Sequence, residues 1–341
     1  MFDPTAARND WSRPRLLDVF GIRSFRQLGA DVGHVIGRLG RGFQVDLTSV
    51  GHLRPDLSLP AYAGHVPADG RAPIMNLFDR VGGGQGYSQR VTKRWCRDFR
   101  GRALTYDEHD GTDFVCPVAT PVVAAAPGEI TLIRDRWLRG GLTMTVDHGA
   151  GLATQYTHLS RALSPVGTPV ARGEVIALSG SSGIDMTTFF PWVAPHVHFM
   201  AWHLGRPVDP FLADDEVERT GSWLHRNAPQ PSRIQDCAFP PAQVDEALAW
   251  QLARDCRDPA IRREIEQLRD APLSLVALLE DSFHHDRSAW PDDHCSARLR
   301  LDGTATIALT LPFGPPRHRG ARFADRCGAE DCRDPTQDDT A

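Results

Sequence analysis

The feature of the sequence that most constrains the fold is a series of short apolar runs between about residues 95 and 215, each bounded by glycine or proline. Four of these runs are "TPVVAAAPGEITLIRD", "GGLTMTVDHGAGLATQYTHLS", "GTPVARGEVIALSG" and "APHVHFMAWHLGRPVDP". Each is typical of a strand, a turn and a second strand. Because no helical pattern separates the runs, we expect an antiparallel β core.

Two of the runs indicate which side chains share a face. In "GLTMTVDHG" the apolar residues alternate at Leu142, Met144 and Val146, as they do in a strand with one buried face. In "PHVHF" His196 and His198 alternate with apolar residues, so both would project from the same face of a strand. Two imidazoles directed at one place raise the question of which other polar groups can reach them.

The rest of the chain divides around this core. Residues 1–94 are a mixed N-terminal extension of unknown role, and residues 95–215 carry the predicted β domain. Residues 216–316 show mostly helical periodicity and end in a predicted hairpin at Asp302–Gly303. Residues 317–341 are polar and charged, and we expect them to be disordered.

Composition excludes some classes of function. A formal charge of -5 and an isoelectric point near 6.3 argue against a nucleic-acid partner. No segment approaches the roughly 18 apolar residues of a membrane span, and the first residues contain no apolar core typical of a signal peptide. The seven cysteines, an odd number, fit a reducing compartment. As written, the sequence therefore predicts a cytoplasmic protein; it makes no prediction of oligomeric state.

Five polar residues of the β region form a candidate site. They are His109 and Asp113 in "HDGTD", His158 in "THLS", and His196 and His198 in "HVHF". Each lies at the end of an apolar run, where strands give way to loops that carry binding residues. Imidazole nitrogen and carboxylate oxygen are ligands that zinc accepts, and a catalytic zinc site needs three of them. The remaining histidines could move protons or stabilise developing charge, and the sequence contains no HExxH motif.

The order and spacing of these motifs resemble the lysostaphin-type zinc endopeptidases, the M23 or LytM-domain family. "HDGTDFVCPVATPVVAAAPGEI" resembles the opening HxGxD of that family, and "VDHGAGLATQYTHLS" resembles its central hairpin. "VGTPVARGEVIALSGSSG" resembles its lipoyl-like turn, and "PHVHF" with "GRPVDPF" resembles its last strands. The resemblance covers about 110 of the 341 residues and implies a mainly β domain, a hybrid of antiparallel sheet and lipoyl-like turns.

The resemblance also implies roles for the five residues. His109, Asp113 and His198 would bind one Zn²⁺ per chain, and His158 and His196 would be catalytic histidines that do not bind the metal. The implied reaction is hydrolysis of a peptide bond in peptidoglycan cross-links by a metal-activated water, with peptide stems as the substrate. The family usually acts in the cell envelope or outside the cell, in contrast to the location expected from the sequence as written.

The sequence departs from the family pattern before its HxH motif. "GSSGIDMTTFFPWVAPHVHF" is several residues longer than usual and carries Phe189, Phe190 and Trp192. We hypothesise that this loop overhangs the substrate groove and narrows access; alternatively, it is an apolar patch covered by a flanking region. Met200 replaces an acidic residue that is common in the family, and His148 matches a position that is often histidine without binding metal.

Two other functions fit the same residues. A module that binds peptidoglycan, or regulates its hydrolysis, could keep the fold without cleaving. A zinc hydrolase of the same fold could act on some other peptide or amide. Zinc content discriminates the binding or regulatory module from an enzyme. The location of the protein discriminates the hydrolase of other amides from a peptidoglycan endopeptidase. The bond that is cleaved, and which of His158 and His196 is the general base, are open at this point.

Overall fold

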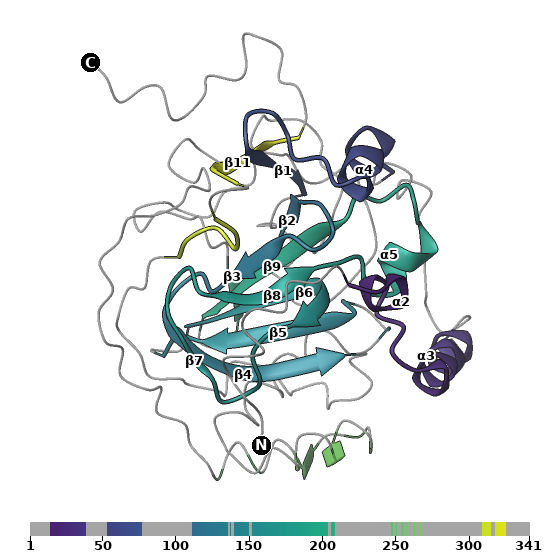
Figure 1. Cartoon of the computed structure of the whole chain (residues 1–341). Helices are drawn as coiled ribbons and strands as arrows, with labels where there is room; N and C mark the ends of the chain where they lie inside the picture. The colour runs from purple at the N-terminus through teal and green to yellow at the C-terminus, as the bar shows by residue number, and fades with distance from the viewer. Residues whose placement is uncertain are drawn as a thin grey trace, which may run out of the picture.

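The structure is a computed structural model, and it describes a subset of the chain. The described residues are 14–38, 53–76, 111–135, 137, 140–149, 152–203, 206–208, 309–314 and 318–324, with isolated positions between 247 and 266. They form a broad sheet with short helices gathered at one side of it, next to the ends of its central strands (Figure 1).

The sheet contains eleven strands. They are β1 (Arg71–Asn76), β2 (Thr112–Val115), β3 (Pro121–Val123), β4 (Gly128–Asp135), β5 (Leu142–Asp147), β6 (Leu152–Ala162), β7 (Pro169–Val170), β8 (Val175–Ser179), β9 (His196–His203), β10 (Arg206–Val208) and β11 (Gly320–Phe323). The order along the main path is β11-β1-β2-β9-β6-β5-β4-β7; β10 pairs with β9, and β8 pairs with β3 and β6. The antiparallel core predicted from sequence is therefore confirmed, and β1 and β11 pair in parallel.

Within the described residues, four helices accompany the sheet. They are α2 (Leu16–Val19), α3 (Phe25–Arg38), α4 (Pro55–Tyr62) and α5 (Ile184–Thr188). Among the described residues, no helix is both long enough and apolar enough to cross a membrane. Three of these helices come from the predicted N-terminal extension, so the described parts of that region, 14–38 and 53–76, lie beside the β domain.

Alternation along the strands builds the core. Leu142, Met144 and Val146 on β5 are buried in one cluster, as their spacing predicts. Val197 and Phe199 of β9 join the same cluster, which leaves His196 and His198 for the opposite face. Burial of these apolar side chains is the main favourable contribution to folding, and here it also fixes which face carries the polar groups.

Residues far outside the predicted β domain complete the sheet. Strand β1 belongs to the predicted extension 1–94, yet it pairs with β2 at Ile74 and Phe114. Disorder was expected for 317–341, and this is wrong for Gly320–Phe323, which pairs with β1. The segment "GARF" has no alternating pattern of its own, and its main-chain pairing with β1 makes it a strand.

The predicted helical region lies largely beyond what the structure describes. Of 216–316, the described part is 309–314 and isolated positions between 247 and 266, so the helices and the turn of the hairpin lie outside the described residues. Leu311 and Phe313 from this region are buried in the core cluster, and Phe313 packs edge-on against Phe114 at 5.3 Å between ring centroids.

Candidate active site

Neighbouring strands bring the predicted site residues together. Asp113 on β2 lies directly opposite His198 on β9, and Thr157 on β6 lies opposite the same histidine. The alternation of "HVHF" directs His196 and His198 to this face while Val197 is buried behind them. Four of the five predicted residues therefore come from three adjacent strands; the fifth, His109, lies outside the described residues.

The four side chains form a compact and buried cluster. His198 Nδ1 lies 2.7 Å from Asp113 Oδ1, and His196 Nε2 lies 3.5 Å from the same oxygen atom. The ring of His158 meets that of His196 edge-on, with 4.7 Å between centroids, and lies 6.1 Å from that of His198. All four residues are at least nine-tenths buried, so any charge that they carry acts on its neighbours in a medium of low dielectric constant.

A bulge in β6 turns His158 toward this cluster. The pairing of β5 with β6 shifts register between Tyr156 and Leu159, and His158 takes a φ of +62°. A left-handed backbone is uncommon outside glycine, and bulges next to functional sites often redirect a side chain. The His158 backbone N–H donates to the Gly140 carbonyl oxygen at 2.9 Å, which holds the bulge in place.

Backbone carbonyl groups orient two of the imidazoles. His158 Nδ1 donates to the carbonyl oxygen of Ser182 at 2.7 Å, and His196 Nδ1 donates to that of Ala194 at 2.7 Å. Because a carbonyl oxygen only accepts, each Nδ1 carries the proton and each Nε2 is the basic nitrogen. Burial, and next the neighbouring His196 imidazole, hold the pKa of His158 well below its ordinary value.

Sequence reasoning missed Ser182, which supports the site twice. Besides accepting from His158, it donates through Oγ to the Leu159 carbonyl at 2.7 Å and accepts from the Leu142 N–H at 2.9 Å. Gly141, with φ +69°, lies so close that a Cβ there would be 2.3 Å from Ser182 Oγ. The paired glycines before β5 and the small residues of "GSSG" are the sequence signals that mark this contact.

The described residues include only part of the predicted metal site. No group of three or more histidine, cysteine or acidic residues that could hold a metal ion occurs within the described ranges. Asp113 and His198 are two of the three predicted ligands, and the third, His109, lies outside those ranges. Gly111, two positions after His109 in the sequence, is described: a Cβ on it would lie 2.8 Å from His198 Cε1. The backbone at the start of "GTD" therefore passes close to the His198 ring.

His148 lies outside this cluster and is held by its own partners. Its Nδ1 donates to the Pro127 carbonyl at 2.8 Å, and its Nε2 lies 2.8 Å from Thr154 Oγ1, whose hydroxyl is hydrogen-bonded to that of Tyr156. Burial lowers the pKa of His148 to about 4, so the ring is neutral near neutral pH. Through these contacts His148 connects the start of β4 with β6, which is a structural role.

The loop before β9 carries three exposed aromatic side chains. Phe189, Phe190 and Trp192 are 40%, 47% and 48% exposed. Phe190 packs edge-on against Phe20 after α2 and Tyr62 in α4, each at 5.0 Å between ring centroids. The N-terminal region therefore contacts this loop through Phe20 and Tyr62, and about half of the Phe190 side chain stays exposed.

Comparison with known proteins identifies the class of this domain. Residues 107–210 match the model of peptidase family M23. This part of the chain is therefore similar to family M23 peptidase domains, and the resemblance predicted from its motifs is confirmed.

Individual relatives share this region. The peptidoglycan DD-endopeptidase ShyB of Vibrio cholerae is 34% identical over 112 residues, 33% of this chain and 24% of that protein. A metalloprotease of Haemophilus influenzae is 36% identical over 102 residues, 30% of this chain and 20% of that protein. A solved structure of a zinc-containing peptidase from Vibrio cholerae is 29% identical, covers 41% of this chain and 40% of that one, and superposes with a TM-score of 0.26. The chain thus spans about a quarter or less of the length of the two curated relatives.

Proposed function

We propose that the protein is a zinc-dependent endopeptidase that hydrolyses peptide bonds in peptidoglycan cross-links. The observation that carries the proposal is the buried cluster of Asp113, His158, His196 and His198, assembled within the region similar to family M23 peptidase domains. Relatives named as a peptidoglycan endopeptidase and as a metalloprotease support the substrate class and the need for a metal.

The chemistry of the donor atoms fits zinc. The Asp113 carboxylate and His198 Nδ1 are buried, adjacent and of the atom types that zinc accepts. His109 would complete the set, which is supported by the position of Gly111 against the His198 ring. His158 and His196 each donate to a backbone carbonyl and not to one of the proposed zinc ligands. This arrangement suits two histidines that do not bind the metal.

The chain's own residues would then act on the substrate in distinct ways. When bound, zinc supplies a water molecule of lowered pKa and polarises the carbonyl of the bond to be cleaved. His158 offers a neutral Nε2 that can accept a proton, because its Nδ1 proton is held by Ser182. His196 Nε2 lies beside Asp113 Oδ1, where a protonated imidazole would be stabilised and could donate to a developing oxyanion.

The exposed aromatic residues of the loop before β9 would narrow the approach to the cluster. We expect the double replacement of Phe189 and Trp192 by serine to raise hydrolysis of whole cross-linked peptidoglycan relative to a small soluble muropeptide, because the approach widens. Leu59→Ser is the matched control, since Leu59 is exposed to a similar extent on α4. An unchanged ratio of the two rates would contradict the proposal that these residues narrow the approach.

Metal removal tests the proposed function directly. The purified full-length chain should release soluble fragments from cross-linked peptidoglycan, lose that activity on dialysis against a chelator, and recover it when about one equivalent of Zn²⁺ is added back. Zinc content by elemental analysis should follow the activity. Tight binding to peptidoglycan without cleavage would favour a binding module, and zinc-dependent cleavage of other amides alone would favour a different substrate.

A further inference from the structure

The N-terminal segment Pro14–Arg23 lies against the loop that anchors His158. The backbone N–H of Ser181 donates to the Val19 carbonyl oxygen at 2.9 Å. Gly21 has a φ of +70°, and a Cβ at this position would lie 2.8 Å from Ser182 Cβ. The segment and the loop are therefore in direct contact, with no room for a larger residue at position 21.

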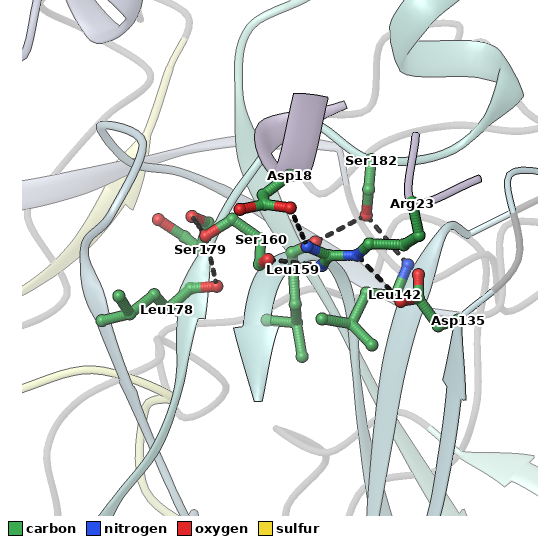
Figure 2. Close-up of polar contacts among 9 residues, drawn as sticks. All are labelled: Asp18, Arg23, Asp135, Leu142, Leu159, Ser160, Leu178, Ser179 and Ser182. Carbon is green, nitrogen blue, oxygen red and sulfur yellow. Dashed lines mark hydrogen bonds and ion pairs between the residues drawn. The ribbon is translucent and has the colours of Figure 1, made fainter. Parts of the chain in front are cut away.

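Arg23 extends the contact to two strands of the sheet (Figure 2). Its Nη2 donates to the carbonyl oxygen of Ser160 at 2.5 Å, and its Nε donates to the Asp135 carboxylate at 2.8 Å. Its Nη1 donates to the carboxylate of Asp18 in α2 at 2.6 Å. Because a guanidinium presents its donors in a rigid planar fork, this one side chain fixes β6, the end of β4 and α2 relative to one another.

A short series of hydrogen bonds connects Arg23 with the His158 ring. The Ser160 carbonyl that Arg23 holds lies next to Leu159, whose own carbonyl accepts from Ser182 Oγ at 2.7 Å. The Ser182 carbonyl in turn accepts from His158 Nδ1 at 2.7 Å. Figure 2 shows Ser160, Leu159 and Ser182 arranged around the guanidinium. The position of His158 is thus determined from both sides, by its own strand and by the loop.

We propose that Arg23 is a positioning residue for the reaction, holding the Ser160 carbonyl and the Ser182 loop so that the His158 imidazole keeps its orientation. The catalytic unit of this chain then extends beyond residues 107–210 to the segment Pro14–Arg23. The inference rests on the proposed function, because Arg23 acts through His158.

The effect of losing Arg23 should fall on the rate. The side chain is 28% exposed, so its ion pairs with Asp18 and Asp135 contribute little to stability. A catalytic group displaced by about 1 Å, in contrast, costs about a hundredfold in rate. If Arg23 had a merely structural role, its replacement would lower the melting temperature and would not lower kcat selectively over KM.

The first test uses zinc-loaded full-length protein and a soluble cross-linked muropeptide. Arg23→Met should lower kcat by at least about tenfold, leave KM within about twofold of the parent value, and leave zinc content unchanged. Arg23→Lys, which keeps the charge but loses the planar fork, should recover only part of kcat. Arg26→Met is the matched control and should behave as the parent, because Arg26 is exposed on α3 and its guanidinium has no partner among the described residues.

A second variant perturbs the Ser182 loop at a different contact, so the inference can still be tested if Arg23→Met misfolds. Gly21→Ala should lower kcat in the same way, because its Cβ would displace Ser182. Gly64→Ala carries the same kind of backbone strain at φ +86° but has no atom within 4 Å of the added Cβ, so it should leave kcat unchanged. Equal kcat values for Gly21→Ala and Gly64→Ala would overturn the inference, as would a rise in KM with no loss of kcat.

A spectroscopic readout separates failure of this inference from failure of the proposed function. In protein labelled with ¹⁵N-histidine, the His158 ring should appear as the tautomer protonated at Nδ1 in the parent and in Arg26→Met. In Arg23→Met the population of this tautomer should fall. If the parent cleaves nothing, the proposed function fails while this comparison still decides the role of Arg23; an unchanged His158 spectrum in Arg23→Met overturns the inference.

Discussion

Asp113→Asn is expected to remove most of the bound zinc and to abolish hydrolysis of peptidoglycan. Asp113 Oδ1 is the atom that both His198 Nδ1 and His196 Nε2 face, so the carboxylate is the centre of negative charge for the cluster. An amide has the same shape but no charge, and zinc prefers an anionic oxygen ligand. Changing an outer partner of a metal ligand already weakens metal affinity by about 10- to 100-fold, and a change in a ligand itself should exceed this.

Asp147→Asn is the matched control for this variant. Asp147 lies on β5 of the same sheet, where its carboxylate accepts from the Gly149 N–H at 2.8 Å, and an asparagine oxygen can accept the same bond. This variant should keep about one zinc per chain and the parent rate. Elemental analysis and fragment release are measured on both proteins. Full zinc content and full activity in Asp113→Asn would contradict its assignment as a ligand.

His158→Asn is expected to retain zinc while kcat falls by about 10²- to 10⁴-fold, the range for loss of a general acid or base. Asparagine tolerates the left-handed backbone that His158 adopts at φ +62°, so the bulge in β6 should survive. Its side-chain amide can also donate to the Ser182 carbonyl, which leaves the missing basic nitrogen as the principal change.

His65→Asn provides the comparison, since His65 is exposed after α4 and remote in sequence from the cluster. It should keep both zinc and kcat. The pair of measurements also discriminates a catalytic site from a binding module, because a module that only binds would show no hydrolysis in the parent or in either variant. A kcat equal to that of the parent, at full zinc content, would assign the proton transfer to another group.

The sequence predicted those parts of the site that depend on strand alternation. The pattern of "PHVHF" placed His196 and His198 on one face, and the order of motifs brought Asp113 and His158 to the same place. The prediction for His196 and His198 succeeded because a strand has a period of two, so local spacing determines the face of each side chain. The direction of His158 instead depends on the bulge in β6, which alternation does not predict.

The groups that orient the histidines could not be predicted in this way. The acceptors for His158 and His196 are main-chain carbonyls, and every residue type carries a carbonyl, so no letter of the sequence marks them. Arg23 reaches β6 from a segment more than a hundred positions away in the chain, and its role depends on long-range packing that local patterns do not encode. The pairing of β11 with β1 was missed for the same reason.

The parallel pairing of β1 with β11 also has a consequence for how the chain folds. It joins residues 71–74 to residues 320–323, about 250 positions later in the sequence, and contacts of such high contact order form slowly because a long loop must close first. During synthesis, β1 emerges early and its neighbour emerges late. Until then β1 lacks this partner, and an unpaired strand edge can pair with another chain. The interval between the two events is therefore the period in which a nascent chain is most exposed to misassociation at this edge.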